Sequence, residues 1–434
     1  MINDIQFTEK NLTSNAGILP LLNYTNNEGI FQVLYETLKF EKTSTEKIKM
    51  NHLKSLVCGG FIGLDRLDRF LQIRHDRLIK ECGIEIRTPE NISRFLGNFT
   101  FKTTQMLRDT NFKIFKKLLA KSKLKEIVID IDSRAENVEG NQEGAVKGYN
   151  PGFIGNKCYN ILYAFCDNLK AFVTGFRRMG NTYTSNGAGE MIKEIIANLK
   201  DVVDNIVFRM DSGYFSEEII EVIESAEYEY VIKAKHYSSM VTQAYSNFDL
   251  EWKELENTNK EYATVTMKLN NWAKAREFVI TREMKSEEEN LQESFFEHDK
   301  YKHNFFVRNT TMTPAEIVTY YAKRANSENY IKETKYDMNI GKLKMHSFWA
   351  NEAFFQIMML VYNIFLLYKM DNTSENEYRQ QINTFRLKYV YVAGKIVTTG
   401  RKTILKILEG YPYKDIFKNC LGYIWKFVDE IYDF

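Results

Sequence analysis

The chain has 434 residues, of which 44% are hydrophobic and 14% aromatic, a composition that excludes a disordered protein and leaves room for two or three structural units. The formal net charge is only +2, so the chain is no polycation, and any surface for nucleic acid must be built from local basic patches. The five cysteines are Cys58, Cys82, Cys158, Cys166 and Cys420. They show neither a CxxC pair nor a histidine at zinc spacing, which favours reduced core thiols in a cytoplasmic protein.

Residues 1–125 are predicted to form a helical N-terminal region, because their apolar residues recur at helical spacing between Gly and polar turns. Its last segment, 101–125, holds eight lysines and arginines against a single acid, Asp109. This segment is either a contact for DNA and for assembly or an ordinary solvated helix surface. The sequence alone does not separate the two.

Two predicted strands end on carboxylates. The run E-I-V-I-D-I-D is rich in β-branched residues, and Asp130 and Asp132 share a face of the strand because they are two residues apart. The run N-I-V-F-R-M leads directly into Asp211. Between these strands the sequence predicts a hairpin that turns at 167–168 and a helix over about 188–199. An Asp pair at a strand end can also mark a simple turn.

A β-rich insertion is predicted over residues 216–309. The connection that follows Asp211 is too long for a simple loop, and four of its segments have strand composition: 228–235, 262–268, 276–282 and 303–309.

The segment 313–336 is predicted to be one helix. Thr313 and Glu316 have the spacing of a capping box, Pro314 suits the first helical position, and no Gly or Pro interrupts the rest of the segment.

One face of this predicted helix is chemically unusual. At roughly 100° per residue, four side chains fall within roughly a 60° arc: Tyr321, Arg324, Glu328 and Lys335. Such a face can be a solvated, salt-bridged surface. A carboxylate between two cations is equally what a helix needs to hold a metal ion and to bind phosphates on either side of it.

Residues 346–434 are predicted to be a helical C-terminal region. The apolar run Ala353–Tyr368 is short for a membrane span and contains Gln356 and Asn363, so we expect a buried core helix and no membrane association. A pair of basic helices is expected from about Glu377, since the window 386–406 has six basic residues and no acid.

The spacing Y-x2-R-x3-E-x6-K resembles the Y-R-E-K signature of DDE transposases from bacterial cut-and-paste insertion sequences. Four further stretches resemble the insertion-sequence group thirteen-eighty: A-G-I-L-P-L, D-I-D-S with G-N-Q-E-G-A, R-M-D-S-G-Y-F, and V-A-G-K-I-V-x3-R-K. The chain departs from the family at Arg134, where a Thr usually follows the first catalytic Asp by two residues.

The resemblance implies an α/β fold with a ribonuclease-H-like catalytic core, a mixed sheet flanked by helices, over residues 126–215 and 310–345. It also implies that Asp132, Asp211 and Glu328 are the catalytic acids and hold two Mg²⁺ or Mn²⁺ ions. Asp132 is preferred to Asp130, because the family's D-x-T frame and the strand-end position both fit it better.

The same resemblance implies that Tyr321, Arg324 and Lys335 bind the backbone of the transposon end. In relatives an aromatic side chain of the insertion stabilises a flipped base. Of Trp252 and Trp272, we choose Trp272, because it precedes a predicted strand in a polar turn with cations nearby, whereas Trp252 stands among glutamates.

The implied partners are the double-stranded DNA of transposon ends and target, bound by a homodimer in the synaptic complex in the bacterial cytoplasm, at the nucleoid. The implied reaction is nicking, hairpin formation and opening, then strand transfer. Two alternatives stay open. A metal-dependent nuclease of the same fold would cut without joining, and a decayed DNA-binding relic would do neither, as Arg134 allows.

Overall fold

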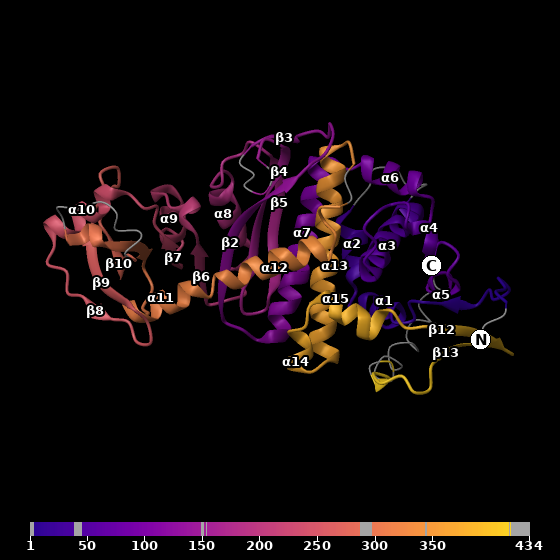
Figure 1. Ribbon diagram of the computed structural model, residues 1–434. Helices are drawn as coiled ribbons and strands as arrows, with labels where there is room; N and C mark the ends of the chain where they lie inside the picture. Colours follow the sequence, from indigo (N-terminus) through magenta and orange to yellow (C-terminus); the bar gives the residue numbers. More distant parts are fainter. Residues whose placement is uncertain are drawn as a thin grey trace. The chain divides into compact units, whose positions relative to one another are not determined.

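The computed structural model describes residues 4–38, 46–148, 152, 154–286, 297–342, 345–415 and 417 (Figure 1). Its contacts divide the chain into two compact units. Unit 1 comprises Met1–Lys121, Glu136–Tyr159 and Ile331–Phe434, and unit 2 comprises Ser122–Ala135 and Asn160–Tyr330. The division predicted from the sequence, into an N-terminal region, a catalytic core, an insertion and a C-terminal region, stays a prediction, because the two units are defined by contacts and not by function.

Unit 2 is built on a mixed sheet in which strands follow the order β4-β2-β6-β7-β11-β10-β9-β8, with β5 paired to β4. The strands are β2 (Glu126–Asn137), β4 (Lys157–Cys166), β5 (Ala171–Met179), β6 (Asn205–Met210), β7 (Glu229–Lys233), β8 (Lys253–Glu254), β9 (Lys260–Met267), β10 (Arg276–Met284) and β11 (Tyr301–Arg308). The central pairs β2–β6 and β6–β7 are parallel. The predicted α/β class with adjacent acid-bearing strands is confirmed, and this order is consistent with a ribonuclease-H-like core.

The central strands are continuous apolar runs because both of their faces are covered. Ile127, Ile129 and Ile131 of β2 are at most 1% exposed. Helix α8 (Ala188–Leu199) packs on β5 and against α9 (Glu217–Glu224), which in turn packs on β7. The predicted hairpin and helix between the acid-bearing strands are therefore confirmed.

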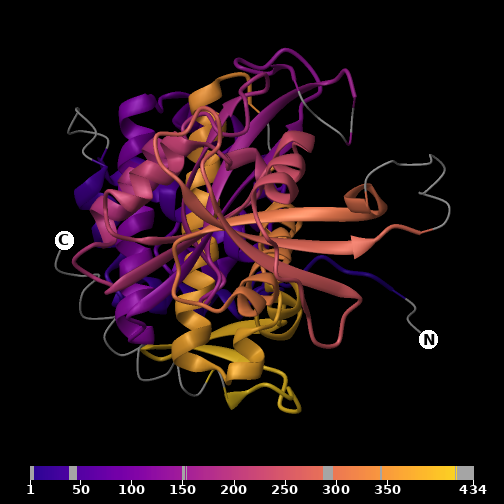
Figure 2. The ribbon, with the colours of Figure 1, turned by 90° about the vertical axis from the view of Figure 1, so that its left-hand side faces the viewer.

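The β-rich insertion continues the core sheet instead of forming a separate one. Strand β11 pairs antiparallel with β7, β10 with β11, and β9 with β10. All four predicted strand segments are present in this part of the sheet, which faces the viewer in Figure 2. The insertion also contains helix α10 (Ser238–Asn247) and a short 3-10 helix, η4 (Glu297–Lys300).

The prediction of a single helix over 313–336 is wrong, because the segment is divided into two helices. The capping box of Thr313 and Glu316 is present, but the segment forms two helices, α11 (Pro314–Ala322) and α12 (Ala325–Tyr336). Between them the amides of Arg324 and Ser327 bond to the carbonyls three residues back, both at 2.9 Å, which tightens the chain into turns. The side chain of Ser327 also donates to the Arg324 carbonyl at 2.8 Å, so it competes with regular helix at this point.

Unit 1 contains the predicted N-terminal helices and a long core helix, α13 (Phe348–Asn372), which packs on α1, α3 and α6. The N-terminal helices are α1 (Ile18–Asn27), α2 (Ile30–Thr37), α3 (Glu46–Ile62), α4 (Phe70–Ile73), α5 (Arg77–Glu81), α6 (Pro89–Gly97) and α7 (Phe101–Ser122). By length and composition α13 could cross a membrane, but 94% of its most apolar window is buried inside the protein, as expected of a core helix.

The basic residues of α7 are partly neutralised within unit 1. Lys117 and Lys121 both pair with Glu28, and Lys121 also contacts Asp371 at 2.6 Å. This part of the basic segment therefore contributes to packing of the helices. The four described cysteines are buried thiols, as expected, and Cys420 lies outside the described residues.

The pair of basic helices expected from about Glu377 is replaced by other elements. Two four-residue helices, α14 (Glu375–Tyr378) and α15 (Ile382–Phe385), lead through a π-helical turn to the hairpin β12 (Gly394–Thr399) and β13 (Lys402–Ile407). The strands form because this stretch is rich in β-branched residues and turns at Gly400, whose φ is 57°. Strand β12 also pairs with β1 (Leu12–Thr13). A further short strand, β3 (Val146–Lys147), pairs with the beginning of β4.

Candidate active site

Two of the three predicted acids meet at the carboxyl end of the central sheet. The parallel register of β2 and β6 pairs Ile131 with Met210, so Asp132 and Asp211, which follow them, lie side by side. Asp211 follows the last residue of β6 as predicted, but β2 continues past Asp132 to Asn137, so the prediction that this strand ends at its acid is wrong. Burial raises the pKa of the Asp132 carboxyl to about 6; Arg324 opposes this rise, and the charge of Asp211 adds to it. The two carboxylates therefore share one electrostatic environment.

Asp130, the alternative first acid, is held in the interior. It is fully buried and receives two bonds from the Arg209 guanidinium, Nε to Oδ1 at 2.6 Å and Nη2 to Oδ2 at 2.8 Å. The side chain of Asp132 is 17% exposed and can therefore reach a ligand. This difference supports the choice of Asp132, which stays a prediction.

Local chain geometry fixes the Asp211 carboxylate. Its Oδ1 accepts a bond of 2.8 Å from the amide of Gly213 and so caps a short 3-10 helix, η2 (Ser212–Tyr214). The phenol of Tyr214 is fully buried there, and burial, together with Asp132 and Asp211, raises its pKa well above the usual range. The D-S-G-Y sequence therefore builds a rigid end to β6.

Arg324 and Tyr321 complete a group around the two acids. Nη1 of Arg324 lies 3.3 Å from Oδ2 of Asp132, and its guanidinium carbon lies 5.9 Å from the centre of the Tyr321 ring. That ring packs on Phe306, with 4.8 Å between centroids. Burial raises the pKa of Tyr321 to about 12, with Arg324 opposing the rise. Four residues predicted from the sequence thus lie together in unit 2.

The structure does not place Glu328 or Lys335 in the group formed by the two acids, Arg324 and Tyr321. Glu328 is exposed in the first turn of α12. Lys335 lies on the portion of α12 that belongs to unit 1, where its ammonium is 5.1 Å from the Tyr336 ring centre. Within the described ranges, no three His, Cys, Asp or Glu side chains gather closely enough to hold a metal ion.

Comparison with a family model identifies the family of the chain. The model described as transposase DDE domain group 1 matches residues 4–428, nearly the whole chain. The chain belongs to this DDE transposase family. Among curated proteins, none matches it.

Two solved transposase structures share 10% sequence identity with the chain. One is a piggyBac transposase synaptic complex with hairpin DNA, which aligns over 88% of this chain and 82% of that one with a TM-score of 0.43. The other is a Mos1 transposase paired-end complex with the left transposon end, which aligns over 36% of this chain and 52% of that one with a TM-score of 0.18.

DDE transposases generally use divalent metal ions, and the donor chemistry of the Asp pair fits such an ion. Asp132 and Asp211 supply carboxylate oxygens, the ligands that Mg²⁺ and Mn²⁺ prefer. A cation between them would also relieve the repulsion that Asp211 exerts on the Asp132 charge. The pair therefore fits a metal ion, and Glu328 is the acid that this structure does not bring to it.

Lys233 is a member of the group that the sequence did not reveal. Strands β6 and β7 pair Met210 with Ile232, so Lys233, the last residue of β7, lies beside Asp211. Burial and the charge of Arg324 lower the pKa of the Lys233 ammonium, whereas Asp211 raises it. A single lysine at the end of an apolar run carries no motif. Only the strand register could have placed it at the acids of this transposase.

Trp272 is packed in the insertion. Its ring is 9% exposed and lies between Phe215 and Phe278, at centroid distances of 5.2 and 5.9 Å. Arg276, expected to contact DNA beside it, stacks on the Trp272 ring at 4.8 Å and pairs with Glu217. Base stacking by this ring would require it to leave the cluster, and that role stays a prediction.

Replacement of Trp272 distinguishes packing from base stacking. We expect Trp272→Ala to lower the free energy of unfolding by about 3–5 kcal/mol, because it leaves a cavity in a packed aromatic cluster. Trp272→Phe, which keeps an aromatic ring, should lose much less. Urea denaturation of both variants measures the difference. Wild-type stability of Trp272→Ala, combined with a selective loss of hairpin product, would favour base stacking instead.

Proposed function

We propose that this chain catalyses cut-and-paste transposition of a bacterial insertion sequence of group thirteen-eighty, acting at the terminal inverted repeats. The observation that carries this proposal is that Asp132 and Asp211 lie side by side, next to Arg324, where the parallel pairing of β2 and β6 ends, in a member of a DDE transposase family. Paired carboxylates at adjacent strand ends are suited to metal-dependent phosphodiester chemistry.

In this proposal Asp132, Asp211 and Glu328 hold two Mg²⁺ or Mn²⁺ ions. When bound, such ions activate a water or a 3′-hydroxyl and stabilise the leaving oxygen of the scissile phosphate. Arg324 has a second role in the protein without DNA, because its contact with Asp132 partly offsets the negative charge of the acid pair. A phosphate that approaches the acids would compete for this guanidinium.

The order of steps follows from the resemblance to the group: nicking at the transposon end, hairpin formation and opening, and strand transfer to target DNA by a homodimer. The site is compatible with this order, since the same acids can serve each hydrolysis and transfer step. The Y-R-E-K assignment adds Tyr321 and Lys335 as further contacts to the DNA backbone.

Sequencing the DNA on either side of the gene tests the class of reaction. A cut-and-paste transposase requires inverted repeats flanked by a short duplication of the target. Purified protein should then join an end duplex that carries one repeat to a circular target. Cutting without any joined product would instead identify a nuclease of the same fold, and neither product would identify a decayed relic.

The phosphate contacts predict a change in salt dependence. Arg324→Ala and Lys335→Ala should each reduce the slope of log K against log salt for an end duplex by about 0.9, the value for one phosphate contact. The measurement is a fluorescence anisotropy titration at several salt concentrations without divalent metal. Lys193→Ala, at an exposed position on α8, removes the same charge as a control. If Arg324→Ala and Lys335→Ala had the same slope as the Lys193→Ala control, the side chains of Arg324 and Lys335 would be solvated and would not contact phosphates.

A further inference from the structure

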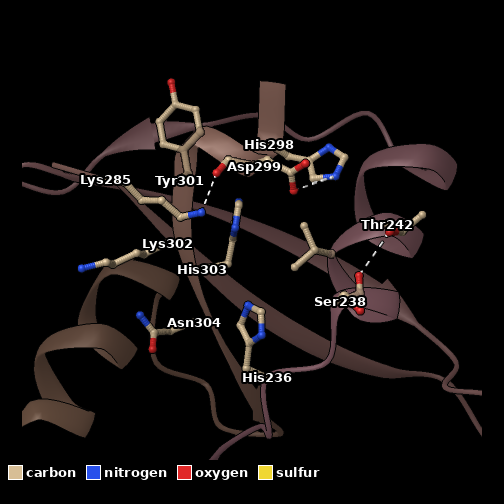
Figure 3. A pocket seen from close by; sticks show the side chains of 11 residues that line it. His236, Ser238, Thr242, Lys285, His298, Asp299, Tyr301, Lys302, His303 and Asn304 are labelled. Atoms are coloured by element: carbon tan, nitrogen blue, oxygen red, sulfur yellow. Dashed lines mark hydrogen bonds and ion pairs between the residues drawn. The ribbon is translucent and has the colours of Figure 1, made fainter. Parts of the chain in front are cut away.

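The insertion contains a cavity of about 420 Å³ that none of the predicted functions uses (Figure 3). Its walls come from the exit of β7, the first turns of α10, η4, and the beginning of β11. All of these elements belong to unit 2, which also carries the two carboxylates. The cavity and the two carboxylates therefore belong to the same compact unit.

Cationic and imidazole groups dominate the wall. Lys285 and Lys302 line the cavity together with His236, His298 and His303. One acid, Asp299, stands among the lining residues. Its carboxylate pairs with His298, with 3.8 Å between Nε2 and Oδ1, and its carbonyl accepts a bond of 2.7 Å from Nζ of Lys285 (Figure 3). The charge that lines the cavity is therefore predominantly positive.

The pKa of the His303 side chain is lowered by its surroundings in the cavity wall. It is 7% exposed on β11, and its Nε2 lies 3.0 Å from the Tyr245 hydroxyl. Burial is the largest cause that lowers the pKa of His303, and His298, His236, Arg282 and Lys285 contribute in turn; together they bring it to about 4. The ring is therefore neutral near pH 7, where it can donate or accept a hydrogen bond at the cavity wall.

Neutral donors complete the wall opposite the lysines. Ser238 and Thr242 lie in the first turns of α10, whose ten residues point the positive end of the helix dipole toward the cavity. Asn304 adds an amide from β11. Lysines, hydroxyls, an amide and a helix N-terminus together are the donor set that proteins use for phosphate oxygens.

The cavity lies close to the acid pair along one strand. Lys233, beside Asp211, is three residues before His236, which limits the Cα separation to about 11 Å. The amide of Ala234 donates to the Phe305 carbonyl at 2.7 Å, so β11 stays attached to this stretch as it enters the cavity wall. A DNA strand that occupies the acid pair with one phosphate can therefore place another of its phosphates in the cavity.

We infer that this cavity binds a backbone phosphate of DNA whose scissile phosphate lies at Asp132 and Asp211. The inference rests on the proposed function, because it takes DNA as the substrate of those acids. It assigns the insertion a defined role in binding: the lysines and donors of the cavity set the path of the strand on the β7–β11 side of the site.

The test compares charge-matched double variants of the full chain. Lys285→Gln/Lys302→Gln removes two charges from the cavity, and the control, called the α8 variant, is Lys193→Gln/Lys200→Gln, which removes one charge from α8 and one from the residue that follows it. The probe is a fluorescein-labelled duplex of 20 base pairs without divalent metal. We expect the cavity variant to lose about eightfold in affinity in 0.1 M salt and about 0.9 in log–log slope for one lost contact, and the α8 variant to lose much less.

Thr242→Val provides a second test, because it keeps the shape of an exposed side chain and removes only the hydroxyl. A loss of about twofold is expected. Equal losses in the cavity and α8 variants, or no loss in either, would overturn the inference. Inorganic phosphate provides the other arm. If it shifts the ring resonances of His303 while the lysine changes leave duplex affinity unaltered, the cavity takes a small phosphate and the assignment to DNA fails.

The two proposals fail in different ways. Duplex binding without metal does not depend on cleavage, so Asp132→Asn should bind like the wild-type chain. A protein that binds through the cavity but never cuts would refute the proposed function and leave the cavity assignment intact. A protein that cuts, and whose cavity variant binds normally, would refute the cavity assignment alone.

Discussion

Asp132→Asn and Asp211→Asn are each expected to reduce cleavage of a transposon end by at least about a thousandfold, equivalent to about 4 kcal/mol of activation free energy. Each change removes a carboxylate from the pair that lies where the pairing of β2 with β6 ends, and an amide oxygen is a far weaker ligand for a divalent cation. Nicking of a labelled end duplex, followed on a denaturing gel, measures the loss.

Binding is the control for this experiment. Gel-shift affinity for the same duplex should stay within a few fold of the wild-type value, because neither acid contacts the backbone by itself. Glu328→Gln should behave like the other two, which would show that the exposed acid of α12 joins the pair during the reaction. Normal cleavage by Asp132→Asn, combined with loss in a folded Asp130→Asn protein, would transfer the role of first acid to Asp130.

Arg209→Met is expected to lower the free energy of unfolding by about 3–5 kcal/mol. Arg209 is fully buried and bonds to Asp130, to Oδ2 of Asp167 at 3.0 Å, and to the Tyr320 carbonyl at 2.7 Å. Tyr330 donates to the other oxygen of Asp167 at 2.9 Å. Removing the guanidinium would leave Asp130 and Asp167 without their cation in the interior of the sheet.

Chemical denaturation of two further variants checks the cause of this loss. Arg379→Met breaks an exposed pair with Glu375 and should cost at most about 1 kcal/mol. Arg209→Met/Asp130→Leu replaces the buried pair by apolar groups and should recover part of the loss, because a buried carboxylate no longer lacks a partner. An Arg209→Met protein with wild-type stability would mean that water or a rearranged side chain satisfies both acids.

Several features of the chain could be read from neighbouring residues alone. The β-branched runs before Asp132 and Asp211 predicted two strands, and both are present; β6 ends directly before Asp211, whereas β2 continues past Asp132 to Asn137. The Thr313–Glu316 capping box marked the beginning of α11. The apolar core helix around Ala353 and the strands of the insertion were predicted in the same way. Each of these predictions depends on propensity or capping, which act over a few residues.

Other features depended on strand register and on packing between distant segments. Asp130 and Asp132 share a face of the strand in the sequence pattern, and the packing shows how their surroundings differ: the guanidinium of Arg209, from another strand, holds Asp130 in the interior, whereas Asp132 is partly exposed. Lys233 reached the acids through the pairing of β6 with β7. The helix that spacing predicted to continue ends at Ala322 and resumes at Ala325, and that break separates Tyr321 from the regular turns of α12.

The sequence by itself determined the family, the α/β class and the chemistry available at the strand ends, because these depend on which residues are present and in what local order. The tertiary structure decided which of those groups meet. Arg324 contacts Asp132 across 192 residues of chain, and Trp272 is enclosed by an aromatic cluster that no local pattern marked. Such contacts are set by the register of the sheet and by the volume left between packed elements, and neither quantity is encoded within a short stretch of residues.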